Sequence, residues 1–122
     1  MGISIIDHLT VGVKEFEKSK EFYIEVLGCL GYDLCLEFPG HAAFGKNGNP
    51  SFWIGQDIKV SPGLHFCFIA ESQESVDKFY NKAIELGAKD NGKPGLRNYA
   101  SNYYASYVID QNGYKIESVC RG

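Results

Sequence analysis

The sequence predicts an α+β fold made of two tandem copies of one βαβββ unit. An internal repeat supports this prediction, because a shift of 57 positions brings His8 onto His65 and Phe22-Tyr23 onto Phe79-Tyr80. A chance match does not keep its register across both a strand and the following helix, so the repeat indicates a duplicated unit. The same shift also aligns the alternating apolar residues of two strands: Leu9, Val11 and Val13 with Phe66, Phe68 and Ala70.

The length and composition indicate one ordinary globular domain. A chain of 122 residues buries one modest core, so we predict a single domain over residues 1–122, with module one at about 1–57 and module two at about 63–122. The net charge of −3, with both signs interspersed, predicts no nucleic-acid or membrane partner. The four cysteines form no CxxC pair and no signal peptide is visible, so we expect a cytoplasmic protein with reduced thiols.

The first module begins with an alternating strand over Ser4–Val13 and continues with a helix at about Glu15–Leu27. Apolar residues recur along this helix at helical spacing, and Gly28 marks its end. Turn signals at Pro39-Gly40 and at 47–49 then separate three short strands. We predict these strands at about Tyr32–Phe38, Ala42–Lys46 and Ser51–Gly55.

The second module repeats this order. A strand over Gly63–Ala70 precedes a helix that begins after Ser72, a good N-cap, and ends at Gly87. Glycines and a proline predict a long loop over Asp90–Tyr99. The final two strands, predicted at about Tyr103–Asp110 and Tyr114–Cys120, meet at the turn 110–113.

Two histidines and one carboxylate form a candidate metal site. His8 and His65 lie opposite the apolar row that must face the helix, so they point to the other side of the sheet. Glu117 interrupts the last apolar run, where an ionised carboxylate is costly unless it is paired or bound to a cation. Two imidazoles and a carboxylate suit a divalent metal with open coordination positions. The alternative is that both histidines are merely hydrogen-bonded strand residues, and His41 is expected to be a solvated loop histidine.

The polar residues of the predicted loop and the strand after it are candidates for contact with a substrate. Arg97 could clamp a carboxylate or phosphonate, and a tyrosine, Tyr99 or Tyr104, could donate a hydrogen bond to a developing oxyanion. We therefore name Arg97, Tyr99 and Tyr104 as catalytic candidates. The alternative is a surface loop whose tyrosines pack along its rim.

The sequence resembles the vicinal oxygen chelate superfamily, which includes glyoxalase I, fosfomycin-resistance enzymes, extradiol dioxygenases and bleomycin-resistance proteins. The resemblance covers nearly the whole chain and implies an open, cup-shaped, eight-stranded mixed sheet with helices on the outside. It also implies one divalent metal, Fe, Mn, Zn or Ni, held by His8, His65 and Glu117. The residues that carry the resemblance are Asp7-His8-Leu-Thr10-Val-Gly-Val13, Phe22-Tyr23, Leu27-Gly28, Gly63-Leu64-His65, Phe79-Tyr80 and Asp110-Gln-Asn-Gly113-Tyr-Lys-Ile116-Glu117.

The resemblance further implies a small metal-dependent enzyme, a lyase, transferase or dioxygenase, that chelates two neighbouring oxygens of a small-molecule substrate. Trp53 stands where glyoxalase I has a glutamate ligand, so authentic glyoxalase I activity is not expected. We expect a homodimer, in which the modules pair either within one chain or between chains. The alternative function is metal-free drug binding of the bleomycin-resistance kind, with aromatic rings as the stacking surface: Trp53, Tyr99, Tyr103 and Tyr104.

Overall fold

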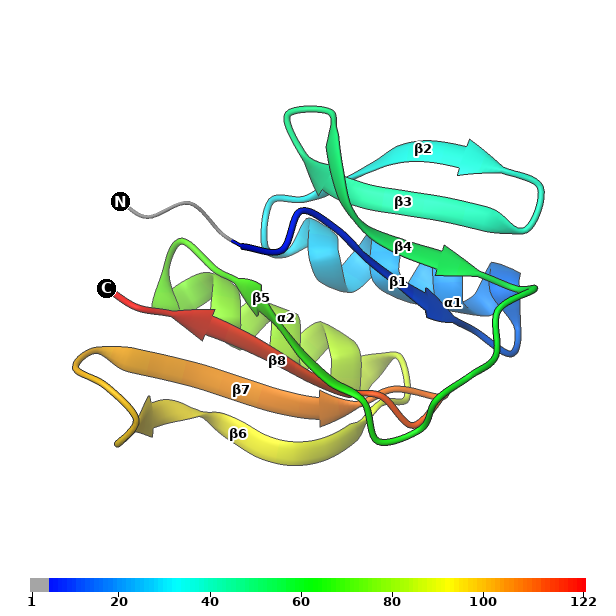
Figure 1. Cartoon of the computed structure of the whole chain (residues 1–122). Coiled ribbons are helices and arrows are strands. Elements are labelled where there is room, and N and C mark those ends of the chain that lie inside the picture. The colour runs from blue at the N-terminus through cyan, green and yellow to red at the C-terminus, as the bar shows by residue number, and fades with distance from the viewer. Residues whose placement is uncertain (1–4) are drawn as a thin grey trace.

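The computed structural model describes residues 5–122 and confirms the two βαβββ modules (Figure 1). Module one contains β1 (Leu9–Gly12), α1 (Phe16–Gly28), β2 (Asp33–Phe38), β3 (His41–Lys46) and β4 (Asn49–Gly55). Module two contains β5 (His65–Ile69), α2 (Gln73–Glu85), β6 (Lys89–Arg97), β7 (Tyr103–Ile109) and β8 (Lys115–Cys120). Neither helix within residues 5–122 is long and apolar enough to cross a membrane.

The predicted eight strands are all present and are divided between two four-stranded mixed sheets. Their orders are β1-β4-β3-β2 and β5-β8-β7-β6, and in each sheet the first pair is parallel while the others are antiparallel. In Figure 1 both helices lie behind the sheets, and α1 contacts α2. Each sheet therefore has a helix-covered face and an opposite face, which we call its open face.

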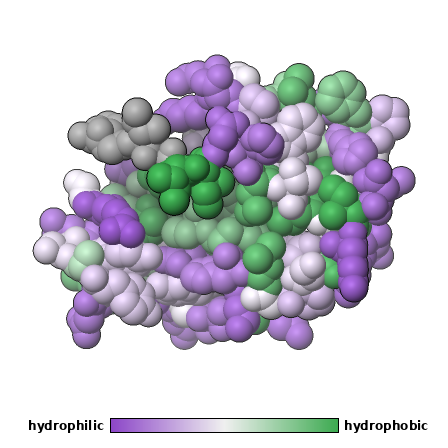
Figure 2. Space-filling model, viewed as in Figure 1, coloured by the Kyte–Doolittle hydropathy of each residue, from purple (hydrophilic) through white to green (hydrophobic). Residues whose placement is uncertain are grey.

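The apolar core fills the helix-covered faces and continues from one module to the other. Val11 and Ile116, one from each module, are both buried in it, as the alternating pattern predicts. The Phe52 ring of β4 lies 5.3 Å from the ring of Phe66 and 5.1 Å from that of Phe68 in β5, measured between centroids. A cavity of about 590 Å³ opens between the modules beside these rings, and Figure 2 shows hydrophobic surface there across the middle of the molecule.

A buried polar network also joins the modules. The Tyr23 hydroxyl of α1 donates a hydrogen bond of 2.6 Å to the Asp110 carboxylate, in the turn between β7 and β8. The backbone N–H groups of Asn112 and Tyr114 donate to the same carboxylate, each at 2.9 Å, and the Lys14 N–H donates to the Asn112 side chain. Burial, followed by the nearby Asp110 charge, raises the pKa of Tyr23 well above its usual value.

One predicted element was wrong, because residues 89–97 form strand β6 where the sequence predicted a loop over Asp90–Tyr99. The strand lies at the edge of its sheet and pairs with β7 only. Its register shifts between Gly92 and Gly95, and Pro94 lies within that shift. An edge strand with a bulge tolerates a proline, which has no N–H to donate, so loop-like residues occur here in a strand.

We predict that Tyr23→Phe lowers the free energy of unfolding by about 1–3 kcal/mol, because buried Asp110 loses a hydrogen-bond donor. Tyr80→Phe is the matched control, since Tyr80 holds the equivalent position in the repeat but bonds to exposed Asp90. We expect the control to cost less than about 1 kcal/mol. Urea unfolding of both variants measures the difference, and equal losses would contradict a special role for the buried pair.

Candidate functional site

The open face of the second sheet gathers most of the polar side chains predicted from the sequence. Strand register places Glu117 of β8 directly between Cys67 of β5 and Tyr107 of β7. Because side chains alternate along a strand and paired residues share a face, these three side chains lie on one side of the sheet. Ile116 and Ser118, their neighbours in sequence, face the helix.

Glu117 is buried, with 3% of its surface exposed, and both of its oxygens are paired. Its Oε1 lies 2.9 Å from Nε2 of His65, and its Oε2 accepts a hydrogen bond from the Tyr103 hydroxyl. A buried carboxylate needs such partners, because loss of water otherwise makes the charged form very costly. Glu117 therefore has the kind of partner that the sequence analysis required, in an imidazole and a phenol.

The groups around Glu117 hold their protons at neutral pH. Burial and the hydrogen bond to Glu117 raise the pKa of Tyr103 to about 12. Burial first, and then the Glu117 charge, also raise the pKa values of the Tyr107 phenol and the Cys67 thiol well above their usual range. Tyr103 is thus a hydrogen-bond donor to the carboxylate, and none of the three groups is a ready base or nucleophile at neutral pH.

Two arginines and a further tyrosine cover this part of the sheet. The Arg97 guanidinium carbon lies 5.2 Å from the centroid of the Tyr107 ring, and that of Arg121 lies 4.8 Å from the centroid of the Tyr103 ring. Tyr99 packs edge-on against Tyr103, with 5.3 Å between the ring centroids. Arg97 and Tyr99, both named from the sequence, therefore lie on the open face with Glu117.

Tyr104, the third catalytic candidate from the sequence, lies on the opposite side of the sheet. Its hydroxyl donates a hydrogen bond of 2.6 Å to Asp77 of α2. Its position therefore gives no support to a role beside Glu117, and Tyr103 is the tyrosine in contact with the carboxylate. The hairpin register could have shown this, since Tyr107 pairs with Glu117 and Tyr103 lies four residues before it on the same face.

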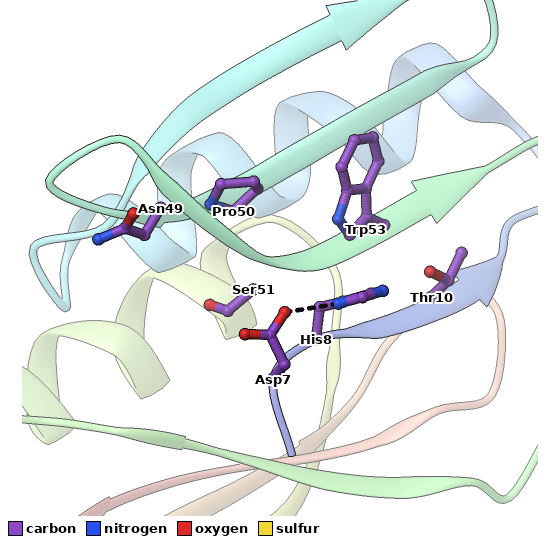
Figure 3. A pocket seen from close by; sticks show the side chains of 7 residues that line it. All are labelled: Asp7, His8, Thr10, Asn49, Pro50, Ser51 and Trp53. Carbon is purple, nitrogen blue, oxygen red and sulfur yellow. Dashed lines mark hydrogen bonds and ion pairs between the residues drawn. The ribbon is translucent and has the colours of Figure 1, made fainter. Parts of the chain in front are cut away.

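His8 lies apart from His65 and Glu117, in the other module. It precedes β1, is exposed, and its Nδ1 lies 2.8 Å from Oδ2 of Asp7. Figure 3 shows its ring between the Asp7 carboxylate and Thr10, with Trp53 projecting from the neighbouring strand. These residues line a pocket of about 450 Å³, completed by Asn49, Pro50 and Ser51.

The third histidine, His41, is not in a free loop as predicted. It begins β3, and its Nε2 lies 2.7 Å from Oδ1 of Asp57.

Two of the three predicted ligands lie at a separation that would suit a shared metal ion. Two ligand atoms that each lie about 2.1 Å from a metal, at right angles, are separated by about 3 Å. The 2.9 Å between His65 Nε2 and Glu117 Oε1 matches that separation. Within residues 5–122, however, no three His, Cys, Asp or Glu side chains are grouped closely enough to hold a metal.

Comparison with known proteins agrees with the fold. The family model of the Glyoxalase/Bleomycin resistance protein/Dioxygenase superfamily matches residues 5–118. A glyoxalase/bleomycin resistance protein from Albidiferax ferrireducens T118 is 30% identical, with a TM-score of 0.84 over 97% of this chain and 100% of that one. A putative glyoxalase from Bacillus halodurans is 25% identical, with a TM-score of 0.71 over 95% of each chain.

More distant structures share the fold. The fosfomycin resistance protein FosX from Listeria monocytogenes is 19% identical, with a TM-score of 0.71 over 98% of this chain and 94% of that one. A search of curated proteins finds no match. The repeated βαβββ modules and the match over nearly the whole chain lead to one conclusion: this protein belongs to the Glyoxalase/Bleomycin resistance protein/Dioxygenase superfamily.

Proposed function

We propose that the protein is a metal-dependent enzyme, a lyase, transferase or dioxygenase, that binds two neighbouring oxygens of a small substrate. The observation that carries this proposal is the buried Glu117 carboxylate beside the His65 imidazole on an open sheet face. A divalent cation, Fe, Mn, Zn or Ni, would be held by His65, Glu117 and a third ligand, His8. When bound, it would polarise the substrate oxygens and stabilise the negative charge that develops on them.

The surrounding tyrosines orient the ligands and remain uncharged themselves. Tyr103 donates to the second oxygen of Glu117, which fixes the orientation of the carboxylate, as hydrogen bonds to metal ligands commonly do. Its raised pKa keeps the proton on the phenol during this contact. Trp53 provides an aromatic wall of the pocket in the first module. The resemblance to glyoxalase I would put a second carboxylate at this position.

We also propose a homodimer in which the third ligand comes from the second subunit. His8 lies on one sheet and Glu117 on the other, and each open face carries exposed apolar side chains: Phe38 is 52% exposed and Ile69 is 70% exposed. Pairing the first sheet of one subunit with the second sheet of the other would cover these side chains. It would also bring His8 of the partner subunit to His65 and Glu117.

The four free cysteines suit the reducing cytoplasm that we expect.

The second candidate function is metal-free binding of a small molecule, as in bleomycin-resistance proteins. Two observations favour it: Glu117 is already fully paired, and Trp53 lines a pocket of about 450 Å³ beside His8. A chelator distinguishes the two functions, since it would abolish metal-dependent activity but leave the affinity of such a binding protein unchanged.

We predict that the chelator-treated protein binds at least one of Fe²⁺, Mn²⁺, Zn²⁺ and Ni²⁺ in a calorimetric titration. His65→Ala and Glu117→Gln should each weaken that binding by more than the 10–100-fold that loss of an outer hydrogen-bond partner typically costs. His41→Ala is the control, because His41 pairs with Asp57 away from the open face of the second sheet. Absence of binding by all four ions, or equal affinity in His65→Ala, would refute the metal site.

A mixed dimer tests whether His8 acts across subunits. We predict that His8→Ala and Glu117→Gln homodimers bind almost no metal, whereas a dimer with one subunit of each kind binds one ion. That ion would use His8 from the Glu117→Gln subunit together with His65 and Glu117 from the other. Differently tagged, co-expressed subunits give the mixed dimer, and elemental analysis counts its metal. A mixed dimer without metal would place the whole site within one chain, whereas metal in the His8→Ala homodimer would exclude His8 as a ligand.

The raised pKa of Tyr103 predicts alkaline lability. An unfolded tyrosine releases its proton near pH 10, whereas folded Tyr103 holds it to about pH 12. Between these pH values the folded state binds more protons, so the free energy of unfolding falls as the pH rises. We expect this fall to be shallower in Tyr103→Phe when urea unfolding is measured from pH 9 to 12. An unchanged slope would show that Tyr103 titrates normally.

A further inference from the structure

We propose that the open face of the second sheet binds an anionic group, so that the substrate is a small carboxylate or phosphonate with neighbouring oxygens. This inference rests on the proposed function, because it names the substrate class of the His65–Glu117 site. The observations that carry it are the positions of the two arginines and the lack, within residues 5–122, of a carboxylate partner for either.

Only two of the twelve basic residues are arginines, and both lie over tyrosines that surround Glu117. Arg97 ends β6 and lies against Tyr107, whereas Arg121 follows β8 and lies against Tyr103. The two guanidinium groups thus lie over two tyrosines next to Glu117, although they come from segments far apart in the sequence. Stacking on aromatic rings holds a guanidinium in place while its N–H edge remains available.

Neither arginine is neutralised by an acid in the described chain. Every ion pair within residues 5–122 uses a lysine or a histidine. Arg97 donates to the carbonyl oxygens of Lys93 and Leu96, at 2.6 and 3.4 Å, which leaves other donors of its five N–H groups unused. Arg121 has no hydrogen bond or ion pair to any residue that the structure describes. An unpaired guanidinium fork matches the two oxygens of a carboxylate or phosphonate.

The charge on this sheet is also segregated by face. Glu117 and Asp90 are the only carboxylates in β5–β8, and Asp90 pairs in register with Val108 on the helix-covered face. Lys115, opposite His65 in register, adds a further exposed cation to the open face. The open face therefore carries at least four cations, since Lys89 pairs with Ile109 on this side, and one buried carboxylate, although the whole chain has a net charge of −3. A local excess of positive charge attracts anions.

Glycines of β6 make room for this arrangement. A Cβ at Gly92 would lie 2.7 Å from the Tyr107 ring, and a Cβ at Gly95 would lie 3.1 Å from an Arg97 nitrogen. A side chain at Gly92 would displace the Tyr107 ring, whereas one at Gly95 would only crowd the end of the Arg97 side chain. Gly92 in the bulged strand β6 therefore makes room for the Tyr107 ring, on which the Arg97 guanidinium stacks.

Calorimetric titration of the full-length protein with oxalate tests the inference, with methylphosphonate as the phosphonate probe and ethylene glycol as the neutral one. Each titration is run on metal-free protein and on protein loaded with Mn²⁺. We expect one or both anions to bind, with Arg97→Gln and Arg121→Gln each weakening binding about tenfold or more. Lys59→Gln removes the same charge from the exposed linker between the modules and should change affinity less than about twofold.

The outcomes separate this inference from the proposed function. The inference is wrong if anion affinity is the same in both arginine variants as in Lys59→Gln. It is also wrong if ethylene glycol binds as well as either anion. In both cases the metal site stands as long as Mn²⁺ binds. If no metal binds while the anions still require both arginines, the inference stands and the metal-dependent function falls. Binding of oxalate alone would identify a carboxylate substrate, and binding of methylphosphonate alone a phosphonate. Circular dichroism spectra that match the wild type show that the variants are folded.

Discussion

The hydrogen bond between Tyr23 and Asp110 joins two modules whose sheets share no strand pairing within residues 5–122. In a single sheet, backbone hydrogen bonds would set the relative position of the two halves. Here side chains must do so, through this buried pair and through the aromatic rings of Phe52, Phe66 and Phe68. The direction in which both open faces point, and hence the geometry of any shared site, depends on such side-chain contacts between the modules.

The duplicated scaffold supports different surroundings on its two halves. In module two the repeated histidine, His65, lies against a buried carboxylate among tyrosines and arginines. In module one His8 pairs with exposed Asp7 beside a tryptophan pocket. The repeat thus preserves a histidine position, whereas the partners of that histidine differ. An unsymmetrical substrate, with a charged end and an apolar end, would suit the proposed site, which combines two such unlike faces.

Much of this architecture could be predicted from the sequence, because alternation and helical spacing are local properties. The same alternation placed His65 and Glu117 on one face, where the structure has them 2.9 Å apart. Alternation alone did not choose between Tyr103 and Tyr104, because that choice also needs the register of the hairpin between β7 and β8, and a one-residue change in register reverses the face. Strand β6 was missed because glycine and proline are typical of loops as well as of bulged edges. The separation of His8 depends on how the modules pack, which no local pattern encodes.

The contact between Tyr103 and Glu117 has a consequence for coordination. One oxygen of the Glu117 carboxylate accepts a hydrogen bond from the Tyr103 phenol, which keeps its proton. A cation would therefore bind through the other oxygen only, and Glu117 would be a monodentate ligand. With two imidazoles, such an ion would have three protein donors and would keep other coordination positions open. A chelating molecule could then enter without displacing any protein ligand. Tyr103 would in this way help to determine how many coordination positions of the metal remain open for a bound ligand.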